Sequence, residues 1–120
     1  MASYKDLQVW QKSMDLVEET YCVLKGLPKE ENYALSDQIR RAVVSIPSNI
    51  AEGQARDSKK EFVRFLYIAQ GSRAELETQL QICVRLKYLS EDQLKNCLQL
   101  NEEVGKMIRT LIKRLSTTNY

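Results

Sequence analysis

Histidine is absent from this 120-residue sequence. Because histidine is the most frequent general base and the commonest metal ligand, its absence disfavours catalysis, although carboxylates can fill either role. The sequence also has no motif of a nucleophilic serine, a phosphate-binding loop, an HExxH zinc site or a dinucleotide-binding glycine turn. The neighbouring acids Glu75 and Glu77, or Glu102 and Glu103, point to different sides of a helix. We therefore expect no enzyme, no catalytic residues, no cofactor and no metal site.

Turn-forming residues are scarce, with two prolines and four glycines. Few turns indicate a small number of long elements. A chain of this length holds one hydrophobic core comfortably and two only with difficulty, so a single domain over residues 1–120 is expected. The content of 43% hydrophobic and 28% charged residues is typical of a soluble globular protein.

Long apolar runs are missing too. No stretch approaches the roughly 20 residues needed to cross a bilayer, and the first residues lack the basic-then-apolar order of a signal peptide. We expect a cytoplasmic protein that does not contact membranes. The three cysteines, Cys22, Cys83 and Cys97, are odd in number and widely spaced. This pattern suggests neither a disulfide framework nor a zinc site, and buried thiols are the simplest interpretation.

Apolar residues recur at helical spacing in four segments, at about 4–25, 34–53, 58–88 and 91–116. In the first segment Ser3 is a candidate N-cap, and Gly26 and Pro28 follow the end of the helix. Its apolar stripe consists of Leu7, Trp10, Met14, Val17, Tyr21 and Leu24. We expect this stripe to face the core.

The second segment has a proline inside its apolar stripe. The stripe of Leu35, Ile39, Ala42, Val43, Ile46, Ile50 and Gly53 keeps its helical phase across Pro47. Proline inside a helix costs about 3 kcal/mol, through a lost N–H and a clash with the preceding turn. We expect a continuous helix that is kinked at Pro47, with Ser45, Ser48 or Asn49 reorganising the hydrogen bonds there.

The last two segments each open on a capping-box pattern, Ser58 with Glu61 and Ser90 with Gln93. The stripe of the third is Phe62, Phe65, Leu66, Ala69, Leu76, Leu80 and Cys83. The stripe of the fourth is Leu94, Leu98, Ile108, Ile112 and Leu115, with Asn101 and Gly105 in the same seam. Four amphipathic helices with short connections predict an all-α, antiparallel up-down-up-down bundle of elongated shape.

Two helices carry a second packable face opposite the core stripe. These faces hold small or apolar residues where an exposed helix usually has Lys and Glu: Val44, Ser48, Ala51, Ala55, Val63, Tyr67, Gly71, Ala74 and Thr78. An apolar second face on a soluble protein marks an interaction surface, and a homo-oligomer covers it without a further helix. The alternative is that alanine is simply a good helix former tolerated in solvent.

The same two helices also carry a set of polar residues: Gln38, Ser45, Asn49, Glu52, Arg73 and Glu77. They are interpreted as a hydrogen-bonded network between helices, with a ligand or nucleic-acid contact as the alternative. Arg73 falls in the middle of an apolar stripe, where a guanidinium cannot stay unpaired. Its partner is Glu77, Glu52 or a carboxylate of another subunit, or its head group extends into water.

The charge is unevenly distributed. Residues 1–39 carry four Lys/Arg and seven Asp/Glu, whereas residues 40–120 carry fourteen and nine. A basic surface permits contact with a polyanion, and the candidates are Arg40, Arg41, Arg56, Lys59, Lys60, Arg64, Lys106, Arg109 and Lys113. For the last three the plainer explanation is that a basic last turn complements the helix dipole. No base-reading motif accompanies them.

Three phrases stand out: YKDLQVWQKS at residues 4–13, LSDQIRRAVVSIPSNIAEG at 35–53 and FLYIAQGSRAELETQL at 65–80, within a resemblance that extends from Tyr4 to about Leu115. Together they resemble the four-helix-bundle family named after the intervening sequences of bacterial 23S ribosomal RNA genes. The resemblance implies a ring-like pentamer whose role is poorly defined and which has no established enzymatic activity. A more distant similarity to the basic, pentameric accessory protein of diversity-generating retroelements implies nucleic-acid binding.

These observations lead to two hypotheses. The first is a non-enzymatic homo-oligomer, a pentamer, that presents basic residues to RNA or to an RNA–protein complex. The alternative is a protein–protein interaction scaffold with no nucleic-acid role.

Overall fold

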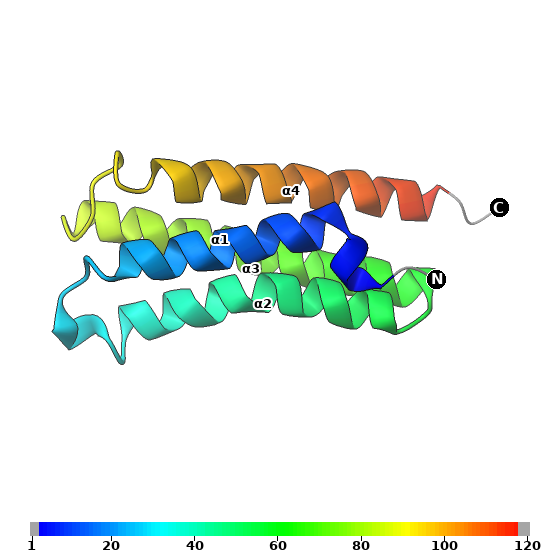
Figure 1. Cartoon of the computed structure of the whole chain (residues 1–120), viewed down its shortest axis with the longest axis horizontal. Helices are drawn as coiled ribbons and strands as arrows, with labels where there is room; N and C mark the ends of the chain where they lie inside the picture. Colours follow the sequence, from blue (N-terminus) through cyan, green and yellow to red (C-terminus); the bar gives the residue numbers. More distant parts are fainter. Residues whose placement is uncertain (1–2, 118–120) are drawn as a thin grey trace.

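The computed structural model describes residues 3–117 and contains four α-helices in this range. They are α1 (Gln8–Leu24), α2 (Leu35–Ala55), α3 (Lys59–Arg85) and α4 (Lys95–Ser116), with 3-10 turns η1 (Tyr4–Asp6) and η2 (Lys29–Glu31). Consecutive helices run in opposite directions along a molecule of 51 × 23 × 20 Å (Figure 1). The packed pairs are α1 with α2, α2 with α3, α3 with α4, and α4 with α1. The antiparallel four-helix bundle is confirmed.

Two helices begin later than the sequence suggested, for reasons seen in their caps. The Ser3 Oγ accepts the Lys5 N–H at 3.2 Å, so it caps the short turn η1, and extended backbone at Leu7 separates η1 from α1. Ser90 and Gln93 form both bonds of a capping box, at 2.9 and 3.1 Å. They close a turn over residues 91–94, and α4 starts only at Lys95.

The third helix ends at Arg85, slightly earlier than expected. Lys87 adopts a left-handed conformation with φ of 62°. The Tyr88 N–H bonds the Cys83 carbonyl at 2.9 Å, which is the closing bond of a Schellman-type helix end. At its start the Ser58 hydroxyl accepts the Glu61 N–H at 3.2 Å, as the capping pattern predicted.

The core-facing side of α1 differs from the prediction. The buried residues are Val9, Ser13, Leu16, Thr20 and Leu24. Met14 and Tyr21, assigned to the core by their spacing, are 38% and 42% exposed, and Trp10 and Val17 are only partly buried. Of the predicted stripe, Leu24 is buried and Leu7, Trp10 and Val17 pack against the edge of the core, whereas Met14 and Tyr21 give α1 an apolar outer face.

Two hydroxyl residues explain this error. Ser13 donates its Oγ–H to the Trp10 carbonyl at 2.8 Å, and the Thr20 Oγ1 lies 3.8 Å from the Cys97 Sγ. Because these contacts satisfy the hydroxyl groups, both side chains are buried without an unpaired polar atom. A hydrophobicity pattern scores Ser and Thr as polar and so selects the neighbouring stripe.

The other three helices bury most of the stripe residues expected of them, while Leu35, Phe62, Leu98 and Leu115 are partly buried against the core. In α2 the buried residues include Ile39, Val43, Ile46 and Ile50, and α2 continues as one helix through Pro47. The kink at Pro47 stays a prediction. Asn101 and Gly105 are buried in the α4 seam, as predicted. Each of the three thiols is free, but Cys22 is exposed, so the expectation of burial holds only for Cys83 and Cys97.

Candidate functional site

The predicted polar cluster separates into two groups. The first joins α2 to α3, where the hydroxyls of Ser45 and Ser72 lie 2.6 Å apart. Asn49 donates its amide to the Ser45 carbonyl at 2.8 Å and to the Ser45 hydroxyl at 3.0 Å. Glu52 pairs with Arg56, the residue that follows α2, at 3.0 Å, and Gln38 is exposed. This group stabilises the packing of α2 on α3.

The second group surrounds Arg73 and joins α3 to α4. The Arg73 side chain is 13% exposed and lies across Gly105. Its Nε donates to Gln70 at 2.8 Å and its Nη1 to the Asn101 carbonyl at 3.4 Å. The Glu77 carboxylate is 3.9 Å away. The contacts of Arg73 within the described residues are therefore made in its own chain.

Two of the nine candidate basic residues are set apart from the others. Arg41 pairs with Asp37 at 3.0 Å, and Arg40 donates to the Asn32 carbonyl at 2.7 Å. Both lie in the first half of α2, whereas Arg56 follows its last residue. Fifteen residues of helix separate Arg41 from Arg56, or about 22 Å. Arg40 and Arg41 are thus not part of one surface with the rest.

Two more arginines are locally neutralised where α2 meets α3. Arg56 and Arg64 lie over the ring of Phe65, with guanidinium carbons 5.0 and 4.6 Å from its centroid. Arg56 pairs with Glu52, and Arg64 pairs with Glu61 at 3.3 Å. These contacts reduce the charge that either arginine offers to a ligand. Lys59 and Lys60, also exposed, open α3 at the same end of the bundle.

Lys106, Arg109 and Lys113 form the remaining group, which we call the α4 basic row. They are exposed and spaced by three and four residues, so they share one side of α4. Within residues 3–117 none of the three has a carboxylate within ion-pair distance, in contrast to Arg41, Arg56 and Arg64. Lys106 still acts on Glu103 at longer range, since its charge helps Lys12 and Gln99 to lower the pKa of that carboxyl.

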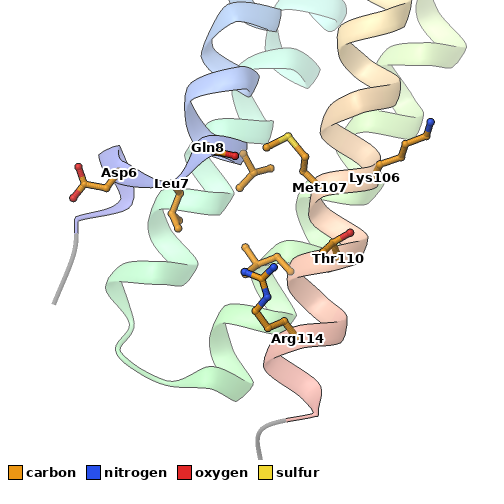
Figure 2. A pocket seen from close by; sticks show the side chains of 9 residues that line it. Asp6, Leu7, Gln8, Lys106, Met107, Thr110 and Arg114 are labelled. Carbon is orange, nitrogen blue, oxygen red and sulfur yellow. The ribbon is translucent and has the colours of Figure 1, made fainter.

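Arg114 adds to this charge, although the sequence did not single it out. Figure 2 shows its guanidinium reaching into a hollow of about 400 Å³ between α4 and the start of α1, while Asp6 and Lys106 point away from it. The walls of the hollow include Leu7, Met107 and other apolar residues. The helix dipole favours any basic residue in the last turn. Residue type alone therefore gives no reason to count Lys113 and not Arg114 as part of a basic surface.

The proposed interface residues are accessible in the single chain. Tyr67 is 61% exposed and Val44 40%; Ser48, Ala55, Gly71, Ala74 and Thr78 are exposed, and Ala51 and Val63 are partly buried. The proposed interface residues of α2 are continuous with the apolar outer face of α1, which lies beside them. The two helices enclose an open groove of about 370 Å³, which we call the α1/α2 groove. It is lined by Tyr4, Trp10, Met14, Val17, Val44, Pro47, Ser48 and Ala51.

No group of three or more Cys, Asp or Glu side chains within residues 3–117 is arranged to hold a metal ion. Of the helices in that range, none combines the length and apolarity needed to cross a membrane.

Comparison with known proteins gives a family match and matches to solved structures. The model of a family described as 23S rRNA-intervening sequence protein matches residues 5–110. The crystal structure of a protein of unknown function from the S23 ribosomal protein family of Bacteroides thetaiotaomicron is similar, with a TM-score of 0.80 and 27% sequence identity. That alignment covers 88% of this chain and 98% of the other. Among curated proteins there is no match.

Proposed function

This chain belongs to the 23S rRNA-intervening sequence protein family, and from that premise we propose that it is a non-enzymatic homo-oligomer, a pentamer, that binds RNA through the α4 basic row. The proposal joins two properties of the surface. One is the positive charge of Lys106, Arg109 and Lys113, which form no ion pair within the described residues. The other is the apolar surface on α1, α2 and α3, which a single copy leaves in water.

The observation that carries RNA binding is the lack of carboxylate partners along the α4 basic row. Protein cations that neutralise phosphates release condensed counterions, and this release provides most of the sequence-independent affinity for nucleic acid. A cation already paired with a carboxylate has less to gain, because the ion pair must be broken first. Lys106, Arg109 and Lys113 have no such ion pair to break. The ring of an oligomer would repeat the row in every subunit.

The salt dependence of binding tests this proposal. With about three phosphates contacted per subunit, the slope of log K against log salt is about −2.1 to −2.7. Raising salt from 50 to 200 mM then weakens RNA binding by about 20- to 40-fold per subunit engaged. We expect fluorescence anisotropy with a structured RNA to show at least this loss.

A matched pair of variants separates the row from net charge. Replacing Lys106, Arg109 and Lys113 by Gln should abolish most of the binding and flatten its salt dependence. Replacing Lys29, Lys87 and Lys95 by Gln removes the same charge from the opposite end of the bundle and should leave most of it intact. Equal losses in the two variants, or no retention of structured RNA at 50 mM salt, would contradict the proposal.

The exposed apolar faces support a second candidate, a protein–protein interaction scaffold with no nucleic-acid role. Ala51→Glu combined with Ala74→Glu should dissociate the assembly under either proposal. Charge reversal at Lys106, Arg109 and Lys113 should matter only if RNA is bound. Light scattering and RNA binding measured on both sets of variants distinguish the two.

A further inference from the structure

Gly71 has no explanation within its own chain. It lies in the middle of α3, where glycine is less favourable than alanine because it loses more conformational freedom. The two other glycines inside helices are required by close neighbours, since a Cβ at Gly53 would approach Phe65 and one at Gly105 would approach Arg73. A Cβ at Gly71 would meet nothing within 4 Å. Close approach of a backbone from another chain would account for the glycine.

We propose that the α1/α2 groove of one copy receives the outer face of α3 from a second copy, with Tyr67, Gly71 and Ala74 as the inserted ridge. This contact rests on the proposed homo-oligomer and names its two surfaces. Tyr67 provides an aromatic anchor, the residue type enriched where interfaces are tightest. Gly71 and Ala74, one and two turns further on, let the α3 backbone approach the groove closely.

The heights of the two surfaces along the bundle agree. The contact between Ser45 and Ser72 places these residues at one level of the antiparallel pair α2 and α3. Five residues toward the end of α2 is Ile50, and five toward the start of α3 is Tyr67, so these two lie at about the same level. By the same steps Gly71 is level with Ile46 and Ala74 with Val43.

The ridge therefore spans the levels of residues 43–50 of α2, and the groove uses Val44, Ser48 and Ala51. A rotation about an axis parallel to the bundle brings one surface onto the other with almost no shift along the axis. Cyclic symmetry requires this geometry, because an axial shift would produce an open filament. Since α3 is the neighbour of α2, ridge and groove are not on opposite sides, and successive copies turn toward a closed ring.

Charge favours the same pairing. The α1 helix carries three carboxylates and one lysine, whereas α3 carries five cations and three carboxylates. Asp6 lies in η1, just before α1 and its groove residue Trp10, and Lys60 lies two turns before Tyr67 on α3. Both lie at the same end of the bundle, so a contact between parallel copies brings their opposite charges to the same end. Exposed ion pairs add little affinity, but they orient the partners.

A ridge-to-ridge dimer is the main competing arrangement. In such a dimer the α3 faces of two copies would pack on each other, which places Lys60 and Arg64 of both copies in one contact. Both grooves would stay exposed to water. A groove-to-ridge contact is heterologous, so every subunit of a closed ring uses both of its surfaces. The two arrangements respond differently to variants that block one surface at a time.

Ser48→Glu blocks the groove and Gly71→Glu blocks the ridge; both positions are exposed, so the fold should tolerate the changes. We expect light scattering to show an oligomer for the wild type and a monomer for each variant. Each variant keeps one intact surface, so an equimolar mixture should form a 1:1 complex of twice the 13.9 kDa chain mass. Asn96→Glu, an exposed change on α4, is the control and should keep the wild-type mass.

Disulfide crosslinking detects the pairing even if a single groove-to-ridge contact is too weak to give a stable complex. In a Cys22→Ser background, mixing Ser48→Cys with Gly71→Cys under mild oxidation should give a crosslinked dimer that neither gives alone. An oligomer that survives Ser48→Glu, or a mixture that neither associates nor crosslinks, overturns the groove-to-ridge contact while the homo-oligomer stands. A monomeric wild type overturns both.

Discussion

The packing of Arg73 on Gly105 gives a prediction whose sign can be worked out. In Gly105→Ala the new Cβ would lie 2.5 Å from the Arg73 Nε and 2.6 Å from its Cζ. Its distance to the Arg73 Cδ would be 3.0 Å. The guanidinium must therefore move, and it then loses the bond from Nε to Gln70, which is 2.8 Å long.

Two terms decide the net effect. Replacing glycine by alanine inside a helix stabilises it by about 1 kcal/mol. A hydrogen bond to a charged group contributes about 1.5–3 kcal/mol, and Arg73 is too buried for water to replace it fully. The loss outweighs the gain, so we expect Gly105→Ala to lower the free energy of unfolding by about 0.5–2 kcal/mol. For a domain of this size the Tm should fall by about 2–8 °C.

The same substitution in an Arg73→Ala background tests the reasoning. Without the guanidinium the added methyl group has no clash, so Gly105→Ala should now stabilise the protein by up to about 1 kcal/mol. Urea denaturation of the four proteins of this cycle, at one protein concentration, measures both effects. If Gly105→Ala stabilises the wild type, or changes both backgrounds equally, the contact with Arg73 does not control the position.

Two further predictions concern the core. Gly53→Ala should lower the Tm more than Gly105→Ala does, because its Cβ would lie 2.6 Å from the Phe65 Cβ, which cannot swing away as a guanidinium can; a smaller loss in thermal denaturation would be evidence against this. Burial raises the pKa of Cys97 to about 11 and also raises that of Cys83, so iodoacetamide at pH 8 should label one thiol per folded chain, Cys22, by mass spectrometry. Because the folded-state pKa of Cys97 exceeds its unfolded value, its contribution to stability is complete below about pH 8.5 and is lost as the pH rises toward 11.

The local part of the charge pattern was readable from sequence spacing. Arg41 and Arg56 have their carboxylates four residues earlier, and Arg64 has one three residues earlier, which places each pair on one side of a helix. The same rule could have removed these arginines from the candidate RNA surface. It could not have found the bond between Lys12 and Glu103, at 2.9 Å, because it joins α1 to α4.

The exposed apolar faces were predicted in part, and their role as an interface stays a prediction. The second faces of α2 and α3 followed from their periodicity, since the core stripes of these helices were correct. The contribution of α1 was missed, because its apolar stripe was assigned to the core. A groove is a property of two helices side by side, and no single helix pattern contains it.

The amino-acid sequence by itself determined that the chain forms four amphipathic helices, and it identified the core sides of α2, α3 and α4. Periodicity acts within one helix, and there burial and spacing agree. Only the tertiary structure decided which side of α1 is buried, because buried Ser13 and Thr20 depend on hydrogen bonds that spacing does not reveal. It alone also decided that Arg73 is paired within the chain, and that Trp10 and Met14 line a groove with Val44 and Ser48, because these contacts join residues far apart in sequence.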